Sequence, residues 1–286
     1  MKYKAWLIYD QKGAERNAEF IRMHRETGDR MQVEVSLIIT EQISDLSLQF
    51  QMEKPDFALV RTIQPELTKQ LEDFGIPVFN NSFVAEICND KGKTLSYVGT
   101  QSSVPVIPTQ RFINSQLSRE LLTYFPDHVV KAVDGHGGSQ VFQTKESWEK
   151  IRKGIGGSDF VIQPFIRGPG RDIRFYVIGR EIVGAVERQA AGDFRANFSL
   201  GGSVRFFSWG EKEKKLVNEI CELFSFGLVG IDFMMDKQGN LLLNEIEDVA
   251  GARMLYQCQP QTRLLEKYFT FILGNLHAGQ SLNILW

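Results

Sequence analysis

Two apolar segments late in the sequence carry acidic residues and are joined by a short turn, and this pair constrains the fold more than any other feature. We expect strands at 229–235 and at Leu241–Glu247, with 236–239 (DKQG) as the turn of an antiparallel hairpin. At a rise of about 3.4 Å per residue, the turn brings Asp232 close to the level of Glu245. Alternation along the strand places Glu245 and Glu247 on the same face.

Three carboxylates that converge from apolar strands would repel one another and lose hydration unless a positive charge lay between them. A divalent metal would supply that charge. Mg²⁺ prefers oxygen ligands and is usually held by one or two carboxylates together with substrate phosphates. The sequence therefore indicates Asp232, Glu245 and Glu247 as candidate metal ligands, and the alternative is a solvated hairpin edge with ordinary surface acids.

A lysine inside an apolar strand, followed at once by glycines, is a candidate phosphate site. Lys131 lies in HVVKAV and precedes DGHGGSQV, whose glycines would let backbone N–H groups approach phosphate oxygens. An ordinary glycine-rich hairpin turn is the alternative, with His136 as an exposed loop residue.

A second basic cluster occupies GRDIRFYVIG, AVERQ and GDFRANFSLGG. Its members are Arg171, Arg174, Arg188 and Arg195, with Asp172 and Asn197 interleaved. Arg171 is compatible with a surface turn, whereas Arg174 and Arg188 lie in apolar, strand-like surroundings. An arginine there would be costly without a carboxylate or phosphate partner, so these two arginines either contact a ligand or form internal salt bridges.

The first ninety residues alternate strand-like and helix-like patterns, which is typical of a parallel α/β lobe. Strands are expected at AWLIYD, VEVSLII, FALVR and IPVFN, with a helix at 14–30. Asn81 and its neighbours offer a cap for one helix over FVAEICNDKGKTLSYVG. Pro105 and Pro108 then mark a domain joint.

The remainder of the chain is richer in strands. HVVKAV, SQVFQT and DFVIQPFI, with a helix at 145–153, predict a small α+β lobe. Strands at IRFYVIG, EIVGAVERQA and VRFFSW, a helix at 211–224, the acidic hairpin and a helix through 268–273 complete the expected order.

Composition excludes several classes of protein. The 33 basic and 35 acidic residues give no basic excess of the kind expected of a dedicated nucleic-acid binder. Cys88, Cys221 and Cys258 are too far apart for a metal clip or a disulfide framework. The apolar stretch near the start is too short for a signal peptide or a membrane span, so we expect a cytoplasmic protein without a membrane or nucleic-acid partner.

The motifs, taken in order, resemble those of ATP-grasp ligases. They are NDKGKT, VVKAVDGHGGSQV, VIQPFIRGPGRDIRFYVIG, AVERQAAGDFRANFSLGGS and GLVGIDFMMDKQGNLLLNEIEDVAG. The likeness is greatest to the RimK-type (alpha-L-glutamate ligase-like) carboxylate-amine ligases, and it spans about residues 90–251. That group includes ligases that add glutamate to ribosomal protein and to coenzyme tails, and amino-group-carrier ligases of lysine biosynthesis.

The resemblance implies an ATP-grasp fold of mixed α/β and α+β class. It places an N-terminal parallel α/β domain at 1–88 and the ATP-grasp domain at 89–286. Within the latter, a small central lid lobe would span about 106–165 and a C-terminal α+β lobe about 166–286. ATP would lie between these two lobes, and a homo-oligomer is expected because the family is often dimeric or tetrameric.

The resemblance also implies roles for individual residues. Lys91 and Lys131 would lie near the phosphates under a DGHGGS lid, and Gln163, Pro164, Phe165 and Ile166 would form the hinge against adenine. Asp172 would contact the nucleotide, Arg195 and Asn197 would contact the phosphates, and Asp232 and Glu245 would bind Mg²⁺, with Mn²⁺ as the alternative ion. Glu247 departs from the usual asparagine, and this change keeps an oxygen ligand but adds a negative charge next to the expected substrate pocket.

The reaction implied is attack of a carboxylate on the γ-phosphate of ATP, followed by attack of an amine on the acyl phosphate. Lys131 and Arg195 would neutralise charge on the phosphates, and Arg174 or Arg188 would contact a substrate carboxylate or the transferred phosphate. Arg253 is a hypothesis for substrate choice because it adjoins the departed motif.

The substrates stay open at this level. The amine is expected to be an amino acid such as glutamate, and the carboxylate could belong to a small molecule, a peptide or a protein tail. Two other functions remain alternatives: an ATP-grasp kinase that phosphorylates a small molecule, and a catalytically silent nucleotide-binding module.

Overall fold

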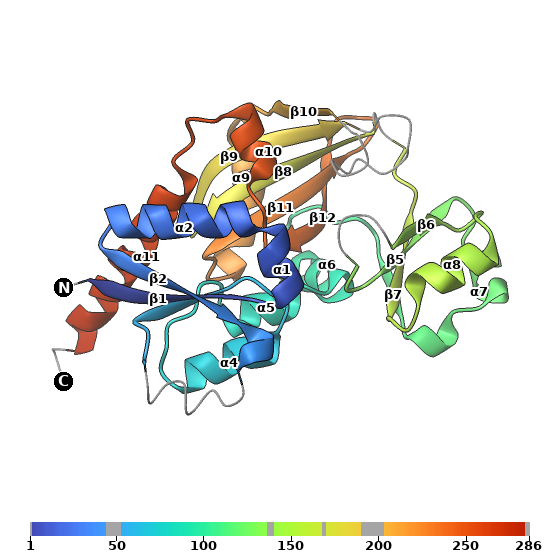
Figure 1. Cartoon of the computed structure of the whole chain (residues 1–286). Coiled ribbons are helices and arrows are strands. Elements are labelled where there is room, and N and C mark those ends of the chain that lie inside the picture. Colours follow the sequence, from blue (N-terminus) through green and yellow to red (C-terminus); the bar gives the residue numbers. More distant parts are fainter. Residues whose placement is uncertain (1, 44–52, 136–139, 168–169, 190–202, 284–286) are drawn as a thin grey trace.

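Three sheets organise the protein, and each follows from a different hydrophobic pattern. The computed structural model describes residues 2–43, 53–135, 140–167, 170–189 and 203–283 (Figure 1). In these ranges the strand orders are β2-β1-β3, β4-β7-β5-β6 and β10-β9-β8-β11-β12.

The N-terminal sheet is parallel, as the alternating pattern predicts. It consists of β1 (Tyr3–Tyr9), β2 (Val33–Ile39) and β3 (Phe57–Val60). Side chains of β1 are buried on both faces: Leu7 packs toward α2 (Ala18–Arg30), while Trp6 packs toward α4 (Pro65–Asp73). Burial on both faces explains why β1 is a continuous apolar run.

Three local expectations for the first hundred residues need correction. The single helix expected at 14–30 is two, α1 (Gln11–Arg16) and α2, because the chain breaks at Asn17. The segment IPVFN forms no strand and makes only a bridge between Val78 and Ala58. The helix expected after Asn81 is also divided, into α5 (Ser82–Cys88) and α6 (Lys91–Gln101), because the Asp90 side chain caps a new helix.

The central sheet lies to one side of the molecule (Figure 1). It contains β4 (Gln110–Phe112), β5 (His128–Ala132), β6 (Val141–Gln143) and β7 (Phe160–Pro164). The short helices η2 (Asn114–Gln116) and α7 (Arg119–Thr123) lie between β4 and β5, and α8 (Trp148–Ile155) lies between β6 and β7. Residues of α7 and α8 pack with Val130, Phe142 and Ile162 in one apolar cluster. Since side chains alternate along β5, Lys131 points to the opposite face from Val130.

The C-terminal sheet is antiparallel and has five strands. They are β8 (Arg171–Ile178), β9 (Glu181–Gln189), β10 (Ser203–Phe206), β11 (Leu228–Met235) and β12 (Leu241–Glu247). One face packs on α5, α6 and α9 (Glu211–Leu223). The expected hairpin is confirmed, and Asp232 pairs directly with Glu245 next to a bulge.

The other face of this sheet is divided between apolar and charged residues. At one end Tyr176 and Leu228 share a core with the N-terminal sheet, with α10 (Arg253–Cys258) and with α11 (Leu264–Asn283). The acidic and basic residues of β8, β9, β11 and β12 occupy the other end. The N-terminal lobe therefore has no separate core on this side, and its packing fixes the neighbourhood of the charged residues.

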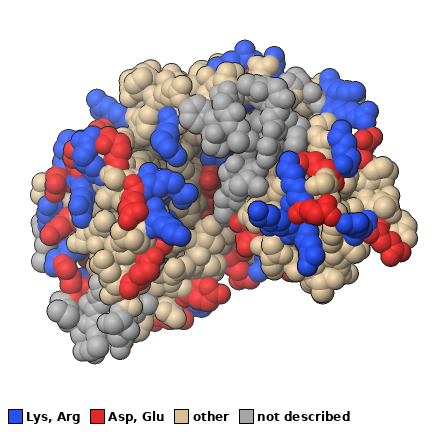
Figure 2. Space-filling model, turned by 45° about the vertical axis from the view of Figure 1, so that its right-hand side comes forward, with Lys and Arg blue, Asp and Glu red and all other residues tan. Residues whose placement is uncertain are grey.

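The surface has no dominant sign of charge on the face that Figure 2 shows. Basic and acidic side chains are intermixed there. Among the described residues, no helix has the length and apolarity that a bilayer crossing requires.

The packing of α8 on β6 gives a test of the central lobe. A Cβ added at Gly154 would lie 2.0 Å from Phe142 Cζ, so Gly154→Ala forces the ring to move. We expect a loss of about 1–3 kcal/mol in the free energy of unfolding, larger than the gain of about 0.5–1 kcal/mol that alanine brings to a helix. Thermal unfolding would measure it.

Gly157→Ala is the matched control, because no atom lies within 4 Å of its added Cβ. Equal melting temperatures for the two variants would contradict the packing described for α8.

Candidate active site

The charged face of the C-terminal sheet collects six ionisable residues from four strands. Strand register places Asp172 opposite Arg188, Arg174 opposite Asp232, and Asp232 opposite Glu245. Directly opposed residues point to the same face, so these five side chains form one surface. Glu247 joins them, two residues beyond Glu245 on β12.

Asp232 lies at the centre of this surface and is 0% exposed. Its Oδ1 accepts a hydrogen bond from Arg174 Nε at 2.7 Å, and its Oδ2 accepts from Arg174 Nη2 and Arg188 Nη2, each at 2.7 Å. Burial alone would raise the pKa of Asp232, but the two guanidinium groups outweigh it and hold the pKa well below its usual range. The carboxylate is therefore charged at neutral pH.

Both arginines have further acidic partners. Arg174 also forms an ion pair with Glu247. Arg188 donates to Asp172 from Nε at 2.6 Å and from Nη2 at 2.7 Å. Burial raises the pKa of Asp172 to about 6, although Arg188 opposes the shift. The structure thus places Arg174 and Arg188 in internal salt bridges, which was one of the two alternatives left open by the sequence.

Two lysines reach this surface from outside the C-terminal sheet. Lys131, on β5, donates to Asn244 Oδ1 of β12 at 2.8 Å. Lys91 is the first residue of α6. Its Nζ lies 3.3 Å from Glu245 Oε2 and also donates to the carbonyl of Gly135. The central sheet and α6 therefore each bring a lysine to β12 of the C-terminal sheet, and we call this meeting of cations and acids the seam.

Burial lowers the pKa of Lys131 to about 8, while Glu245 partly opposes the shift. Burial also disfavours ionised Glu245, but Lys91 reverses the effect and lowers the pKa of that carboxyl. A fraction of Lys131 is therefore neutral just above physiological pH.

The donors suit a metal only in part. Within the described ranges, no group of three or more histidine, cysteine, aspartate or glutamate side chains is arranged to hold a metal ion. Glu245 and Glu247 are half-buried and present oxygen donors on one face, which fits Mg²⁺ held by one or two carboxylates. Asp232 already accepts from both arginines, so its role as a ligand stays a prediction.

The predicted hinge begins at the end of β7. Gln163 is buried, its Nε2 donates to Thr109 Oγ1 at 2.9 Å, and its Oε1 has no partner. Beyond Pro164, the backbone N–H of Phe165 donates to the carbonyl of Asp127 at 2.9 Å. The hinge therefore connects to the start of β5 and holds one unsatisfied acceptor.

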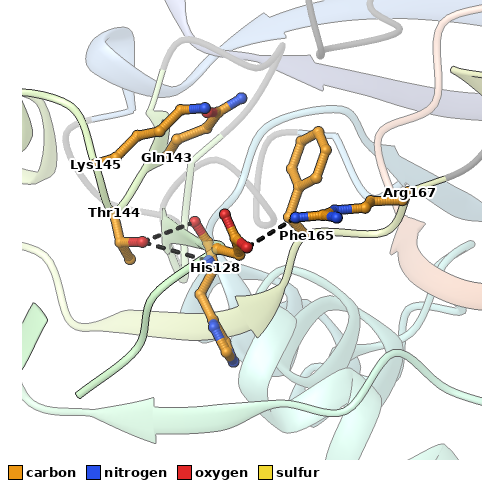
Figure 3. A pocket seen from close by; sticks show the side chains of 7 residues that line it. His128, Gln143, Thr144, Lys145, Phe165 and Arg167 are labelled. Atoms are coloured by element: carbon orange, nitrogen blue, oxygen red, sulfur yellow. Dashed lines mark hydrogen bonds and ion pairs between the residues drawn. The ribbon is translucent and has the colours of Figure 1, made fainter. Parts of the chain in front are cut away.

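A pocket of about 210 Å³ adjoins the hinge (Figure 3). Its lining comes from the ends of β5, β6 and β7, and consists of Asp127, His128, Gln143, Thr144, Lys145, Phe165 and Arg167. In Figure 3, Gln143 and Lys145 lie across from Phe165 and Arg167. The pocket is below the roughly 300 Å³ of typical ligand sites, so it could receive only part of a nucleotide.

Some residues that the sequence predicts for the site lie outside the described ranges, and others lie away from the charged surface. Arg195, Asn197, His136 and the remaining lid glycines are outside the described residues. Arg171 is paired with Glu187, 3.3 Å away, which lies on the opposite face of β9 from Arg188. Arg253 begins α10 and is exposed.

The structure adds residues that the sequence did not single out. Asn244 accepts a hydrogen bond from Lys131. The buried Asp248 accepts hydrogen bonds from Asn80 Nδ2 at 2.5 Å and from Asn89 Nδ2 at 3.1 Å. Burial raises the pKa of Asp248 despite these bonds. Of these residues, only Asp248 could be noticed in the sequence, because it departs from the family pattern. Its partners Asn80 and Asn89 are more than 150 residues away in sequence.

Residues 108–260 match the sequence profile of the RimK-like ATP-grasp domain, which is more than half of the chain. The chain belongs to the RimK-like ATP-grasp family. The family predicted from the motifs is confirmed.

Relatives and solved structures agree with membership of the RimK-like ATP-grasp family. An uncharacterized protein, MG011 of Mycoplasma genitalium, is 27% identical over 267 residues, covering 91% of this chain and 89% of its own. A probable alpha-L-glutamate ligase of Shewanella pealeana is 30% identical over 194 residues, covering 65% of this chain and 42% of its own. This chain therefore spans less than half of that relative.

Solved structures confirm the ATP-grasp fold. A RimK domain protein ATP-grasp from Sphaerobacter thermophilus superposes with a TM-score of 0.71 at 17% identity, over 94% of this chain and 99% of its own. D-alanine–D-alanine ligase from Bacillus anthracis, complexed with ATP, superposes with a TM-score of 0.69 at 18% identity, over 98% of this chain and 99% of its own.

The central ion pairs give a stability prediction. Asp232→Asn keeps the shape of the side chain but leaves two buried guanidinium groups with a neutral amide. We expect a loss of about 3–5 kcal/mol in the free energy of unfolding by urea. Asp73→Asn is the control, because Asp73 pairs with Lys69 at 2.6 Å on the surface, where about 0–1 kcal/mol is expected.

The same carboxylate predicts a response to acid. Its folded pKa is lowered, so its contribution to stability is present above the unfolded pKa of about 3.9 and is lost as the pH falls below it. The free energy of unfolding of Asp232→Asn should therefore fall less between pH 5 and pH 3 than that of the native protein, by roughly 1 kcal/mol, because one group contributes at most about 1.4 kcal/mol per pH unit below its unfolded pKa. Parallel pH profiles would contradict this account.

Proposed function

We propose that the protein is an ATP- and Mg²⁺-dependent ligase that joins a carboxylate to an amine through an acyl phosphate and releases ADP. One observation carries the proposal. Lys131 of the central sheet and Lys91 of α6 meet Asn244 and Glu245 of the last hairpin, so cations and acids face each other between the sheets that would enclose a nucleotide. Membership of the RimK-like ATP-grasp family supports the same reading.

In this proposal the nucleotide lies in the seam between the central lobe, about 106–165, and the C-terminal lobe, about 166–286. Its base would contact the hinge of residues 163–166, where Gln163 Oε1 lacks a donor, and would also contact the adjoining pocket. Lys91 and Lys131 would contact the phosphates. By family likeness, Arg195 and Asn197 would also contact them, and Asp172 would contact the nucleotide.

The metal would be held by Glu245 and Glu247, with Asp232 beside them. When bound, Mg²⁺ neutralises charge on the phosphate oxygens during transfer. Glu247 replaces the asparagine usual in the family, and its ion pair with Arg174 offsets the added negative charge. Arg174 and Arg188 would hold Asp232 in place and keep that face close to neutral.

The reaction needs no nucleophilic side chain. A substrate carboxylate oxygen attacks the γ-phosphorus, the bond to the β-phosphate oxygen breaks, and ADP leaves. The amine then attacks the acyl carbon, phosphate leaves, and the amine gives up a proton. Lys131 would neutralise charge in the first step.

The substrates are proposed by class. An amino acid such as glutamate is proposed as the amine, because relatives over part of the chain are named probable alpha-L-glutamate ligase. The carboxylate would belong to a small molecule, a peptide or a protein tail. We retain a kinase as the second candidate, since ATP-grasp geometry delivers phosphate to an oxygen in either case, and a kinase would leave a stable phosphoester.

The test is a screen of amino acids and peptides for phosphate release with Mg²⁺ and ATP, with mass spectrometry of the products. We expect an amide product and free phosphate. Lys131→Met should lower the rate about 100-fold or more, because it removes a preorganised cation. Lys212→Met, at an exposed position on α9, should leave the rate unchanged. A phosphoester product would favour the kinase, and a flat assay with every pair would contradict both.

The shifted pKa of Lys131 predicts a pH dependence. Since the charged ammonium is the form that binds phosphate, kcat/KM for ATP should fall as the pH rises through about 8. Lys131→Arg should remove this alkaline decline, because a guanidinium stays charged in this range. Initial rates at limiting ATP from pH 6.5 to 9.5 would measure it, and a decline that persists in the arginine variant would assign the titration to another group.

A further inference from the structure

One residue of β12 has no partner on β11. Asp232 of β11 pairs with Glu245, but the next residue of β11 pairs with Leu243. Asn244 is therefore the extra residue of a β-bulge. Leu243 and Ile246 are buried in the same apolar cluster, and the two polar residues between them are both half-buried. Strict alternation would send one of these polar side chains into the apolar cluster, whereas the bulge turns both toward the seam.

The segment that leads into the central lobe holds this bulge in place. On the outer edge of β12, the N–H of Leu243 donates to the carbonyl of Pro105 at 2.8 Å. The carbonyl of Leu243 accepts from the N–H of Ile107 at 3.0 Å. Since β11 lies against the other edge of β12, the backbone next to Asn244 is fixed from both sides. The direction of the Asn244 side chain is thus set by main-chain pairing.

The contact with Lys131 fixes which way the Asn244 amide faces. Lys131 Nζ lies 2.8 Å from Asn244 Oδ1, and an ammonium group can only donate. The amide oxygen is therefore the atom that faces the lysine, and Nδ2 is directed away from it. Among the described residues, Asn244 Nδ2 donates to no acceptor. Because Asn244 is half-buried, a ligand in the seam can reach this donor.

An ammonium and an amide donor side by side suit an anion. In the proposed function Lys131 contacts the phosphates, and a phosphate oxygen has enough lone pairs to accept from two donors at once. An aspartate in place of Asn244 would also hold the lysine, but it would add a negative charge beside Glu245 and repel phosphate. The amide gives the lysine an acceptor and leaves a donor for the anion, with no net charge.

We propose that Asn244 binds a phosphate oxygen of the nucleotide through Nδ2 while its Oδ1 holds Lys131. The proposal rests on the proposed nucleotide site and adds a phosphate-binding residue to it. Lys131 belongs to the central sheet and Asn244 to the C-terminal sheet, so one phosphate group is held from both lobes. A direct contact of this kind differs from a residue that only joins the lobes.

Calorimetry on the full-length protein, without carboxylate or amine substrate, tests the proposal. The probes are ADP and adenosine, each measured with Mg²⁺ and again in EDTA. We expect Asn244→Leu to weaken ADP binding about tenfold or more, the usual scale for a hydrogen bond to a charged group, and to leave adenosine binding unchanged. The loss should persist in EDTA, because the donor contacts phosphate and not the metal. Asn218→Leu, at an exposed position on α9, is the matched control and should bind like the native protein.

A double-mutant cycle separates a direct contact from an effect through Lys131. If Asn244 only positioned Lys131, Asn244→Leu would change nothing once Lys131→Met had removed the ammonium. We expect Asn244→Leu to weaken ADP binding in that background as well, by about threefold or more.

Asn244→Asp is the decisive variant if Asn244→Leu fails to fold. It keeps the shape of the side chain and the acceptor for Lys131, but it has no donor for phosphate. We expect it to weaken ADP binding about tenfold or more without lowering the melting temperature. Asn218→Asp controls for the added charge.

The outcomes separate this inference from the proposed function. If ADP binds equally well to the native protein and to the Asn244 variants, or if the loss disappears in EDTA or in the Lys131→Met background, the inference is overturned and the ligase proposal stands. If ADP binding depends on Asn244 but no phosphate is released with any substrate pair, the inference stands and the ligase proposal fails. If the native protein binds no ADP, both are overturned.

Discussion

The pairing of Asp232 with Arg174 and Arg188 is the interaction on which the rest of the candidate site depends. A carboxylate at the centre of a sheet is tolerated only because both of its oxygens accept charged hydrogen bonds. The same arginines extend to Asp172 and Glu247, so five side chains from four strands hold one another in place. Each ion in this network keeps its neighbours from being buried unpaired.

This network also balances charge where the central lobe meets the C-terminal sheet. Four acids and four cations lie along the seam: Asp172, Asp232, Glu245 and Glu247, and Lys91, Lys131, Arg174 and Arg188. Within the C-terminal sheet, the described contacts of the two lysines are with β12, and burial lowers the pKa of Lys131. The buried arginines are thus held in place by their acidic partners. The two lysines are the cations that a phosphate could contact.

Much of the architecture follows from local pattern. The strands at Val33–Ile39 and Leu241–Glu247 end where the apolar alternation ends. Helix breaks were harder to place, because Asn17 and Asp90 interrupt patterns that are otherwise continuous. IPVFN has the composition of a strand but makes only an isolated bridge at Val78. Strand formation needs a partner edge, and sequence pattern does not report whether one is within reach.

The sequence by itself determined the family, the parallel N-terminal sheet and the opposition of Asp232 and Glu245, because motif order, apolar periodicity and a short turn are local properties. It also predicted a positive charge among the acids of the hairpin, with a solvated hairpin edge as the alternative. Only the tertiary structure decided that arginines supply that charge and that Lys131 reaches Asn244. These contacts join residues from different lobes, and their partners depend on how whole sheets pack, which no local pattern encodes.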